Sequence, residues 1–235
     1  DKQKVTALTQ KHRSLFRFLF RLHNRFPFVN RRKGRIRTQA GLSYLKGCRI
    51  TGGAGNTLII GDYARLKNCV FHIEGTGNTV QIGPWCHCEN AEFCIEDNGC
   101  TITLGRHTYL CGNVQLAAME GTDITVGEDC LFSSAVRLRT GDSHSLLKKS
   151  TGERINPSAS IVIGTTPGAD GCVVGAGSLL TKAYSQPNCV LAGVPAREVK
   201  QDVDWTIREF KAPLRKLAAA GRTVRPVMAE GFTAV

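Results

Sequence analysis

The stretch Ile59–Ala64 reads IIGDYA, and similar hexapeptides follow it at intervals of 22 residues, namely Gln81–Cys86 (QIGPWC), Thr103–Thr108 (TLGRHT) and Thr125–Cys130 (TVGEDC). In each of them an aliphatic residue is followed by glycine. The glycines form two columns, Gly61, Gly83, Gly105 and Gly127, and Gly55, Gly77, Gly99 and Gly121. A period kept over four copies predicts a coil of short strands that stacks on copies of itself.

Apolar residues keep the same period as the glycines and alternate within each coil, as strands require. The predicted core columns are Leu58, Val80, Ile102 and Ile124, then Ile60, Ile82, Leu104 and Val126, then Leu66, Cys88, Leu110 and Phe132, and a mixed column of His72, Cys94, Leu116 and Leu138. Glu92 interrupts a further apolar column of Val70, Val114 and Val136. The sequence pattern does not explain this acid, and a corner or an outward turn of the chain at Glu92 stays open. His87 and His107 stand at outward positions and are interpreted as surface residues.

The period breaks once. Ile161, Ile163 and Gly164 repeat the pattern of the preceding coil after 37 residues instead of 22, which leaves about 15 extra residues between Thr140 and Ser158. This polar insertion contains His144. Insertions in a repeat array form surface loops and often lie on the binding face, so a candidate active-site loop is expected at 140–157.

The period alone would also suit a right-handed β-helix of the polysaccharide-lyase kind. The coil, however, is built of three hexapeptides and four further residues. The stretch 173–200 (VVGAGSLLTKAYSQPNCVLAGVPAREVK) resembles the closing coil of hexapeptide-repeat acyltransferases. The loop GDSHSL and the following TGERINPSASIVIG are similar to the branch that O-acetylates sugars and surface polysaccharides. The resemblance covers residues 53–200 and implies a left-handed parallel β-helix. The predicted fold is all-β, this β-helix with an N-terminal and a C-terminal helix that the sequence pattern outside the resemblance indicates.

The resemblance also implies an activity and its residues. It implies transfer of an acetyl group from acetyl-CoA to a saccharide hydroxyl, without a metal, by a homotrimer with sites between neighbouring subunits. His144 matches the general base of the family. Four residues match positions that touch CoA in the family, namely Ala176, Thr181, Lys182 and Arg197. Lys200 takes a position where the family often places a basic residue.

The chemistry fits these residue types. A sugar hydroxyl is a poor nucleophile at neutral pH, and an imidazole can take its proton during attack on a thioester. A carboxylate often orients such an imidazole, and Asp142 or Glu153 is a candidate. Cationic side chains such as Lys182 and Arg197 suit the phosphates of CoA. Three other functions stay open: N-acetylation of an amino or nucleotide sugar, a non-catalytic scaffold, and a lyase, against which the lack of clustered carboxylates counts.

One segment departs from the family. Only the short stretch TTPGADGCVV separates Gly164 from Gly175, where the family has a longer segment with a tryptophan-containing hexapeptide and a further turn of coil. Either residues are absent from this sequence, which is the favoured explanation, or the coil is truly shortened. A true deletion would throw the β-helix out of register and remove part of the CoA site.

Basic residues concentrate at the beginning of the chain. Residues 1–37 hold twelve Lys or Arg and a single acid, Asp1. An amphipathic helix is predicted over Val5–Asn24, with Arg13, Arg17, Arg21 and Arg25 in one stripe. Residues 4–37 could contact an anionic membrane, but packing on a neighbouring subunit or capping of an open sheet edge is favoured. Nucleic acid is not expected, because no binding motif is present.

The sequence as a whole predicts how the chain is divided and where the protein acts. Three parts are predicted: a basic arm (1–40), the β-helix with its loop (41–200), and a C-terminal helix from Asp202 to Ala220 with its tail (201–235). No run of 18 apolar residues occurs, and the apolar segment from Leu15 to Val29 is interrupted by arginines, so a cytoplasmic protein is expected, with peripheral membrane contact left open. Ten cysteines without a CxxC pair are interpreted as small buried side chains, and a metal site at Cys86 and Cys88 is disfavoured.

Overall fold

The structure is a computed structural model that describes residues 2–26, 30–164 and 171–205. The chain divides into two compact units, Asp1–Asp204 and Trp205–Val235, and the sheets and helices described belong to the first unit. The helix predicted from Asp202 to Ala220 lies, beyond residue 205, outside the described residues.

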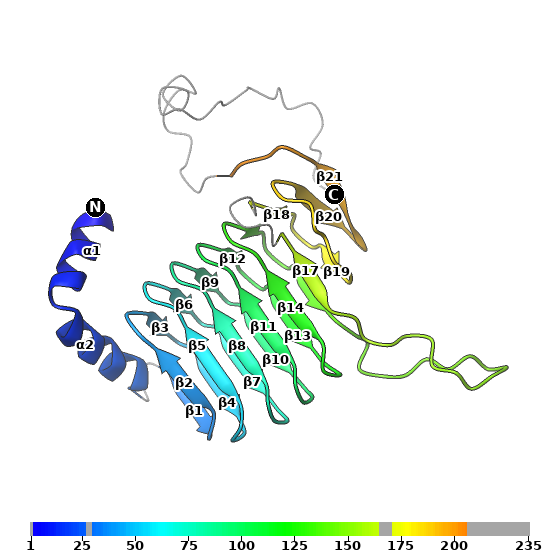
Figure 1. Cartoon of the computed structure of the whole chain (residues 1–235), viewed down its shortest axis with the longest axis horizontal. Helices are drawn as coiled ribbons and strands as arrows, with labels where there is room; N and C mark the ends of the chain where they lie inside the picture. The colour runs from blue at the N-terminus through cyan, green and yellow to red at the C-terminus, as the bar shows by residue number, and fades with distance from the viewer. Residues whose placement is uncertain (1, 27–29, 165–170, 206–235) are drawn as a thin grey trace. The chain divides into compact units, whose positions relative to one another are not determined.

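The described strands form three sheets whose strands run along successive turns of one coil (Figure 1). The first sheet contains β1 (Arg31–Gly34), β4 (Arg49–Gly52), β7 (Val70–Ile73), β10 (Glu92–Ile95), β13 (Gln115–Ala118), β16 (Arg137–Arg139) and β19 (Leu179–Leu180). The second contains β2 (Arg37–Ala40), β5 (Thr57–Ile60), β8 (Thr79–Ile82), β11 (Thr101–Leu104), β14 (Asp123–Val126) and β17 (Ile161–Ile163). The third contains β3 (Tyr44–Lys46), β6 (Arg65–Lys67), β9 (His87–Glu89), β12 (Tyr109–Cys111), β15 (Leu131–Phe132), β18 (Val173–Val174), β20 (Val190–Gly193) and β21 (Ala196–Lys200).

The pairing of these strands follows the repeat in the sequence. Ile102 of β11, for example, pairs with Val80 of the preceding coil on one side and with Ile124 of the following coil on the other. All neighbouring strands pair in parallel except β20 and β21, which are antiparallel. This confirms the predicted all-β fold, a parallel β-helix. Its first strand begins at Arg31, so the coil starts earlier than residue 41, where the sequence placed it.

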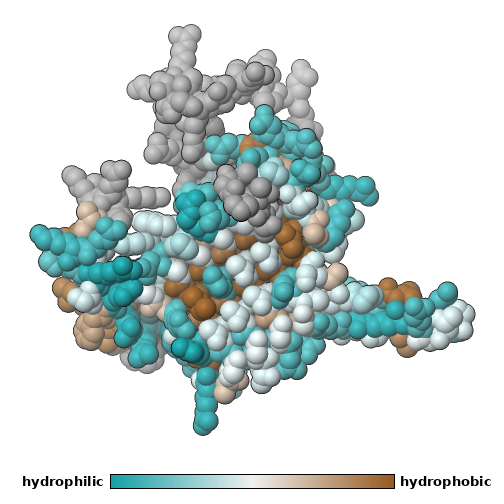
Figure 2. Space-filling model, viewed as in Figure 1, coloured by the Kyte–Doolittle hydropathy of each residue, from teal (hydrophilic) through white to brown (hydrophobic). Residues whose placement is uncertain are grey.

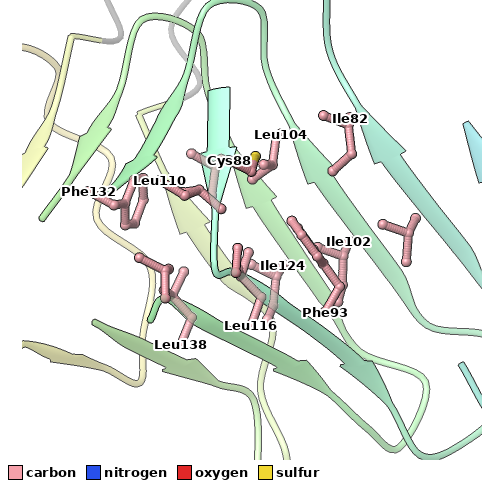
Figure 3. Packing of buried hydrophobic residues seen from close by; sticks show 14 of the residues in the cluster. Ile82, Cys88, Phe93, Ile102, Leu104, Leu110, Leu116, Ile124, Phe132 and Leu138 are labelled. Atoms are coloured by element: carbon pink, nitrogen blue, oxygen red, sulfur yellow. The ribbon is translucent and has the colours of Figure 1, made fainter. Parts of the chain in front are cut away.

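Side chains that point inward from the three sheets form ladders in a continuous core (Figure 3). Three of the predicted columns, those headed by Leu58, Ile60 and Leu66, are buried throughout. In the first sheet, Phe71 and Phe93 stack with their ring centroids 4.7 Å apart. Burial of this kind stabilises the coil by roughly 1.5–3 kcal/mol for each large apolar side chain.

The predicted mixed column of His72, Cys94, Leu116 and Leu138 is wrong in its first two members, because the residues that share a ladder with Leu116 and Leu138 are Phe71 and Phe93. Phe93 pairs with Leu116, one position beyond the repeat period, whereas Cys94 pairs with Ala117. The corner that leads from Cys111 to Gln115 is one residue longer than the equivalent corner before Glu92, and the chain regains its period in the next strand. The ladder in the core is therefore Ile50, Phe71, Phe93, Leu116, Leu138 and Leu180.

The same shift explains Glu92. Its side chain points outward from β10, and its Oε2 accepts a hydrogen bond of 3.0 Å from Nε2 of Gln115 in the next coil. The buried position before it belongs to Ala91, which takes the place that Cys69 and Val114 occupy in neighbouring coils.

The corners are tight because residues of successive coils adopt left-handed backbone conformations there. Tyr63, Trp85, His107 and Asp129 have φ between 52° and 64°. Just before them, a Cβ atom on Gly105 would lie 2.4 Å from the carbonyl carbon and oxygen of Gly127. Glycine is required at this column because backbone, and not a flexible side chain, fills the space.

The short segment between Gly164 and Gly175 does not throw the β-helix out of register. β17 pairs with β14, β18 pairs with β15, and β19 pairs with β16, so each ladder continues into the last coil.

Two helices precede the coil, α1 (Lys2–Lys11) and α2 (Arg13–Arg25). They confirm the predicted N-terminal helix, with a break at His12. The end of α2 covers the edge strand of the third sheet. Asn24 accepts a hydrogen bond from the Leu45 N–H (3.0 Å) and donates one to the Ser43 carbonyl (2.8 Å). Asn30 donates to the Leu45 carbonyl (3.1 Å) and accepts from the Cys48 N–H (2.9 Å), so the edge that β3 would leave open is capped.

Candidate active site

The predicted loop leaves the β-helix after β16 and returns to it at β17. Figure 1 shows it projecting away from the coils. Its outer part is a small hairpin, in which Leu147 and Arg154 form an antiparallel bridge and the Lys148 N–H donates to the Glu153 carbonyl at 2.8 Å. His144 lies between β16 and this hairpin, at the base of the loop.

Asn156 organises the base of this loop. Its Oδ1 accepts a hydrogen bond of 2.6 Å from the Leu146 N–H. Its Nδ2 donates to the Asp142 carboxylate (3.0 Å) and to the His144 carbonyl (2.9 Å). One amide side chain therefore fixes both predicted catalytic residues relative to each other, although it was not among the residues that the sequence singled out.

The His144 side chain is exposed. In the described part of this single chain, the hydrogen-bond partner of the Asp142 carboxylate is Asn156 and not the imidazole. Glu153, the other candidate for orienting His144, lies in the outer hairpin. The imidazole is therefore open to solvent.

An ion pair ties the loop to the coil beside it. Nη2 of Arg154 lies 2.8 Å from Oε1 of Glu120, and the Ser158 N–H donates to Oε2 of Glu120 at 3.2 Å. The hydrogen bond from Arg154, followed by those from Ser158, holds the pKa of Glu120 below its ordinary value. A second tie joins Nη2 of Arg139 to Oγ of Ser143 at 2.9 Å. The loop is held at both of its ends.

Replacing Glu120 by glutamine is expected to loosen the loop. Glutamine keeps the size of the side chain but removes the charge that Arg154 and Ser158 engage. Limited trypsin digestion should then cut after Lys148 and Lys149 several-fold faster than in the wild type. Glu128→Gln, which removes a carboxylate paired with Arg106 away from the loop, is the matched control and should leave the rate unchanged. An unchanged rate in the Glu120 variant would show that this ion pair does not order the loop.

The predicted CoA contacts lie in the last coil. Ala176 is exposed in the turn between β18 and β19, and Thr181 is exposed directly after β19. Lys182 and Arg197 line one open groove of about 370 Å³, together with Ala183, Tyr184, Ser185, Gln186 and Glu198. Lys182 Nζ lies 5.6 Å from the centre of the Tyr184 ring, within cation–π range.

The return of β21 on β20 creates this groove. Tyr184 donates its hydroxyl hydrogen bond to the Ala196 carbonyl at 2.8 Å, which brings Arg197 next to the segment that carries Lys182. Lys200 stands at the end of β21, opposite Val190, and is not among the described residues that line the groove. The structure therefore brings together two of the three predicted cations.

A histidine and a carboxylate meet elsewhere, at a place that the sequence analysis interpreted as plain surface. Nδ1 of His107 lies 2.6 Å from Oδ1 of Asp129, at equivalent corners of successive coils. Nearby, His87 stacks on Tyr109 with ring centroids 5.6 Å apart, and burial, followed by the charge of Arg65, lowers the pKa of His87. His107 and Asp129 are separated by the repeat period, which was the signal that could have predicted the pair.

In the part of the chain that the structure describes, neither helix has the length and hydropathy needed to cross a membrane.

Two solved structures have the same fold over nearly their whole lengths. The polysialic acid O-acetyltransferase OatWY matches with 21% sequence identity and a TM-score of 0.67, covering 82% of this chain and 98% of that chain. The polySia-specific acetyltransferase NeuO matches with 22% identity and a TM-score of 0.63, with the same coverage of both chains. No protein-family profile and no curated protein matches this sequence. The resemblance predicted from the last coil and the loop is thereby confirmed at the level of the fold.

Proposed function

We propose that this protein is an acyltransferase that moves an acetyl group from acetyl-CoA to a hydroxyl of a saccharide, in the modification of a surface polysaccharide or another glycan. The observation that carries the proposal is the shared fold with two O-acetyltransferases of polysialic acid along 98% of each of their chains. The projecting loop with His144 and the groove with Lys182 and Arg197 support it.

In the proposed reaction, His144 is the general base. Its imidazole takes the proton of the acceptor hydroxyl as the oxygen attacks the thioester carbonyl, and then returns a proton to the departing CoA sulfur. The exposure of His144 supports this role, since the acceptor must reach the imidazole from solvent or from a cleft. Asp142, two residues before His144, is the proposed orienting carboxylate. Its carboxylate and the His144 carbonyl both accept hydrogen bonds from the amide of Asn156.

We assign the binding of CoA to the last coil. The phosphates of CoA need cations, and Lys182 and Arg197 supply two of them at one groove, with Lys200 further along β21. Ala176 stands between Gly175 and Gly177 in an exposed turn, where small residues allow a ligand to approach the backbone closely. Thr181 adds a hydroxyl directly before Lys182.

Lys182→Ala and Arg197→Ala are each expected to raise the KM for acetyl-CoA by roughly tenfold or more, because hydrogen bonds to charged groups contribute about 1.5–3 kcal/mol. The value of kcat should stay nearly unchanged, since these side chains bind a part of CoA far from the reacting carbon. Lys67→Ala removes an exposed lysine that pairs with Glu89 and is the control. A fall in kcat without a rise in KM would contradict this assignment.

The proposed assembly is a homotrimer with the acceptor and CoA between the β-helices of neighbouring subunits. The loop supports it, because it projects away from the coils of its own chain (Figure 1). The expected place of action is the cytoplasm, where a reducing environment keeps cysteines such as the ten of this chain as thiols. Light scattering of the purified protein should give three times the chain mass.

The test of the activity is the release of free CoA from acetyl-CoA in the presence of a panel of saccharides. Turnover with hydroxyl sugars, neutral or acidic, supports the proposal. Turnover that requires an amino sugar would instead favour N-acetylation on the same scaffold. A folded protein that neither binds nor turns over acetyl-CoA would be better explained as a non-catalytic β-helix.

A further inference from the structure

Helix α2 makes several polar side-chain contacts with the β-helix. Nη2 of Arg13 lies 2.8 Å from the Asp62 carboxylate, Nε2 of His23 lies 3.1 Å from the Leu45 carbonyl, and Asn24 is buried against β3. Before it, the hydroxyl of Thr9 in α1 lies 3.2 Å from that of Tyr63. These polar contacts lie on the side of α2 that also carries the half-buried Phe16 and Phe20.

A second group of apolar residues of α2 is exposed. Leu15, Phe18, Leu19 and Leu22 are 55, 62, 46 and 53% exposed. Their spacing of three, four and seven residues places them in one strip along the helix. Leu8 and Phe26, before and after the strip, are also exposed. Figure 2 shows hydrophobic surface over this helix. Soluble proteins seldom leave a contiguous apolar strip of this kind uncovered.

Arginines of the same helix line a cavity beside this strip. The cavity has a volume of about 570 Å³ and is lined by Arg17, Arg21 and Arg25 of α2, by Arg32 of β1, and by uncharged residues of the helix and the first coils, with no acidic residue among the described residues of its lining. Burial, followed by the charge of Arg25, lowers the pKa of Arg32. Four cations that face one cavity without a carboxylate favour the binding of an anion.

The strip and the arginines are adjacent on the helix. Arg21 follows Phe18 by three residues, and Arg25 follows Leu22 by three, so both border the apolar strip. The beginning of the coil adds Arg31, Lys33 and Arg35, which are all exposed. The helix and the beginning of the coil therefore combine exposed apolar groups with many cations.

We propose that this face binds an anionic lipid membrane. The apolar strip of α2 enters the boundary between headgroups and acyl chains, and the arginines of the cavity and of β1 bind lipid phosphates. An acidic polysaccharide would satisfy the arginines but leave the apolar strip exposed. A second copy of the chain, meeting the first through the same face, would bring two sets of arginines together. A strip covered by another face of a neighbouring subunit would keep the protein off both kinds of vesicle in the test below. A lipid surface satisfies both features at once.

The test is flotation of the full-length protein with vesicles of phosphatidylcholine alone or mixed with phosphatidylglycerol. The wild type should float only with the anionic vesicles. Two variants should each lose at least tenfold in binding, one with Leu15, Phe18, Leu19 and Leu22 replaced by glutamine, and one with Arg17, Arg21 and Arg25 replaced by glutamine. Glutamine is a good helix former, so the helix should persist.

The matched control removes three exposed cations from the coils (Arg65→Gln, Lys67→Gln and Arg137→Gln) and should float like the wild type. A wild type that stays with neither kind of vesicle overturns the proposal. So does a loss of binding in the arginine variant alone, which would indicate a site for soluble polyanions.

Insertion can be measured without any loss of function. Phe18→Trp keeps an aromatic side chain in the strip, and its fluorescence should be quenched by bromine-labelled acyl chains in anionic vesicles, with the wild type as baseline. Absence of this added quenching in a variant that floats would show that the strip does not enter the lipid.

Discussion

His144→Asn is expected to lower kcat for acetyl transfer by about 10²–10⁴-fold, the usual contribution of a general base. Asparagine has a similar size and can keep the loop, but it cannot accept the hydroxyl proton. The His144 side chain is exposed and makes its fixed contacts through the backbone, so its loss should change neither the free energy of unfolding nor the KM for acetyl-CoA. Free CoA released with an active saccharide measures the effect.

His107 provides the control for this prediction. It pairs with the Asp129 carboxylate at a corner of the coil, and it has φ of 57°. Asparagine tolerates this left-handed conformation, so His107→Asn removes the imidazole with little backbone strain. It should retain transfer. Transfer that survives in the His144 variant and disappears in the His107 variant would move the base to the corner of the coil.

Phe93→Ala is expected to lower the free energy of unfolding by about 3–5 kcal/mol, the range for removal of a buried aromatic ring. Phe93 has no exposed surface, stacks on Phe71, and is followed by Leu116 in the same ladder. Neighbouring coils are held in register by hydrogen bonds on both sides of β10 and cannot collapse into the cavity. Urea denaturation followed by circular dichroism measures the change.

Phe18→Ala deletes the same group from an exposed position of α2 and should change the free energy of unfolding by less than about 0.5 kcal/mol. Equal effects of the two substitutions would be incompatible with a core that contains Phe93 and excludes Phe18.

The repeat predicted most of the fold because equivalent residues of successive coils pack against the same kinds of neighbours. A column such as Ile102 and Ile124 must be apolar in every copy, and this periodicity is visible without the structure. The one-residue shift at Leu116 was missed because the longer corner before β13 is compensated directly after it, which keeps the glycine columns in phase. Local spacing could not reveal such a compensated change.

The candidate site was predictable only in part. His144 was indicated by the break in the period and by the resemblance of its loop. The role of Asn156 depends on how the inserted loop folds back on itself, and the sequence pattern does not contain that information. Likewise, Lys182 and Arg197 meet because β21 reverses direction on β20, a feature that the parallel repeat does not predict.

The capped edge at β3 has a consequence for how copies of this protein can associate. A β-helix with open ends can grow into a fibre by stacking end on end, because unpaired backbone groups at one end match those at the other. Here the amides of Asn24 and Asn30 occupy such groups at one edge, and Arg31, Arg32 and Lys33 place like charges along the adjacent edge strand β1. At the opposite end of the third sheet, the last strand β21 is antiparallel to its neighbour, so its backbone groups do not match those of a parallel strand such as β3. Growth of a fibre by end-on-end stacking of these edges is thereby disfavoured.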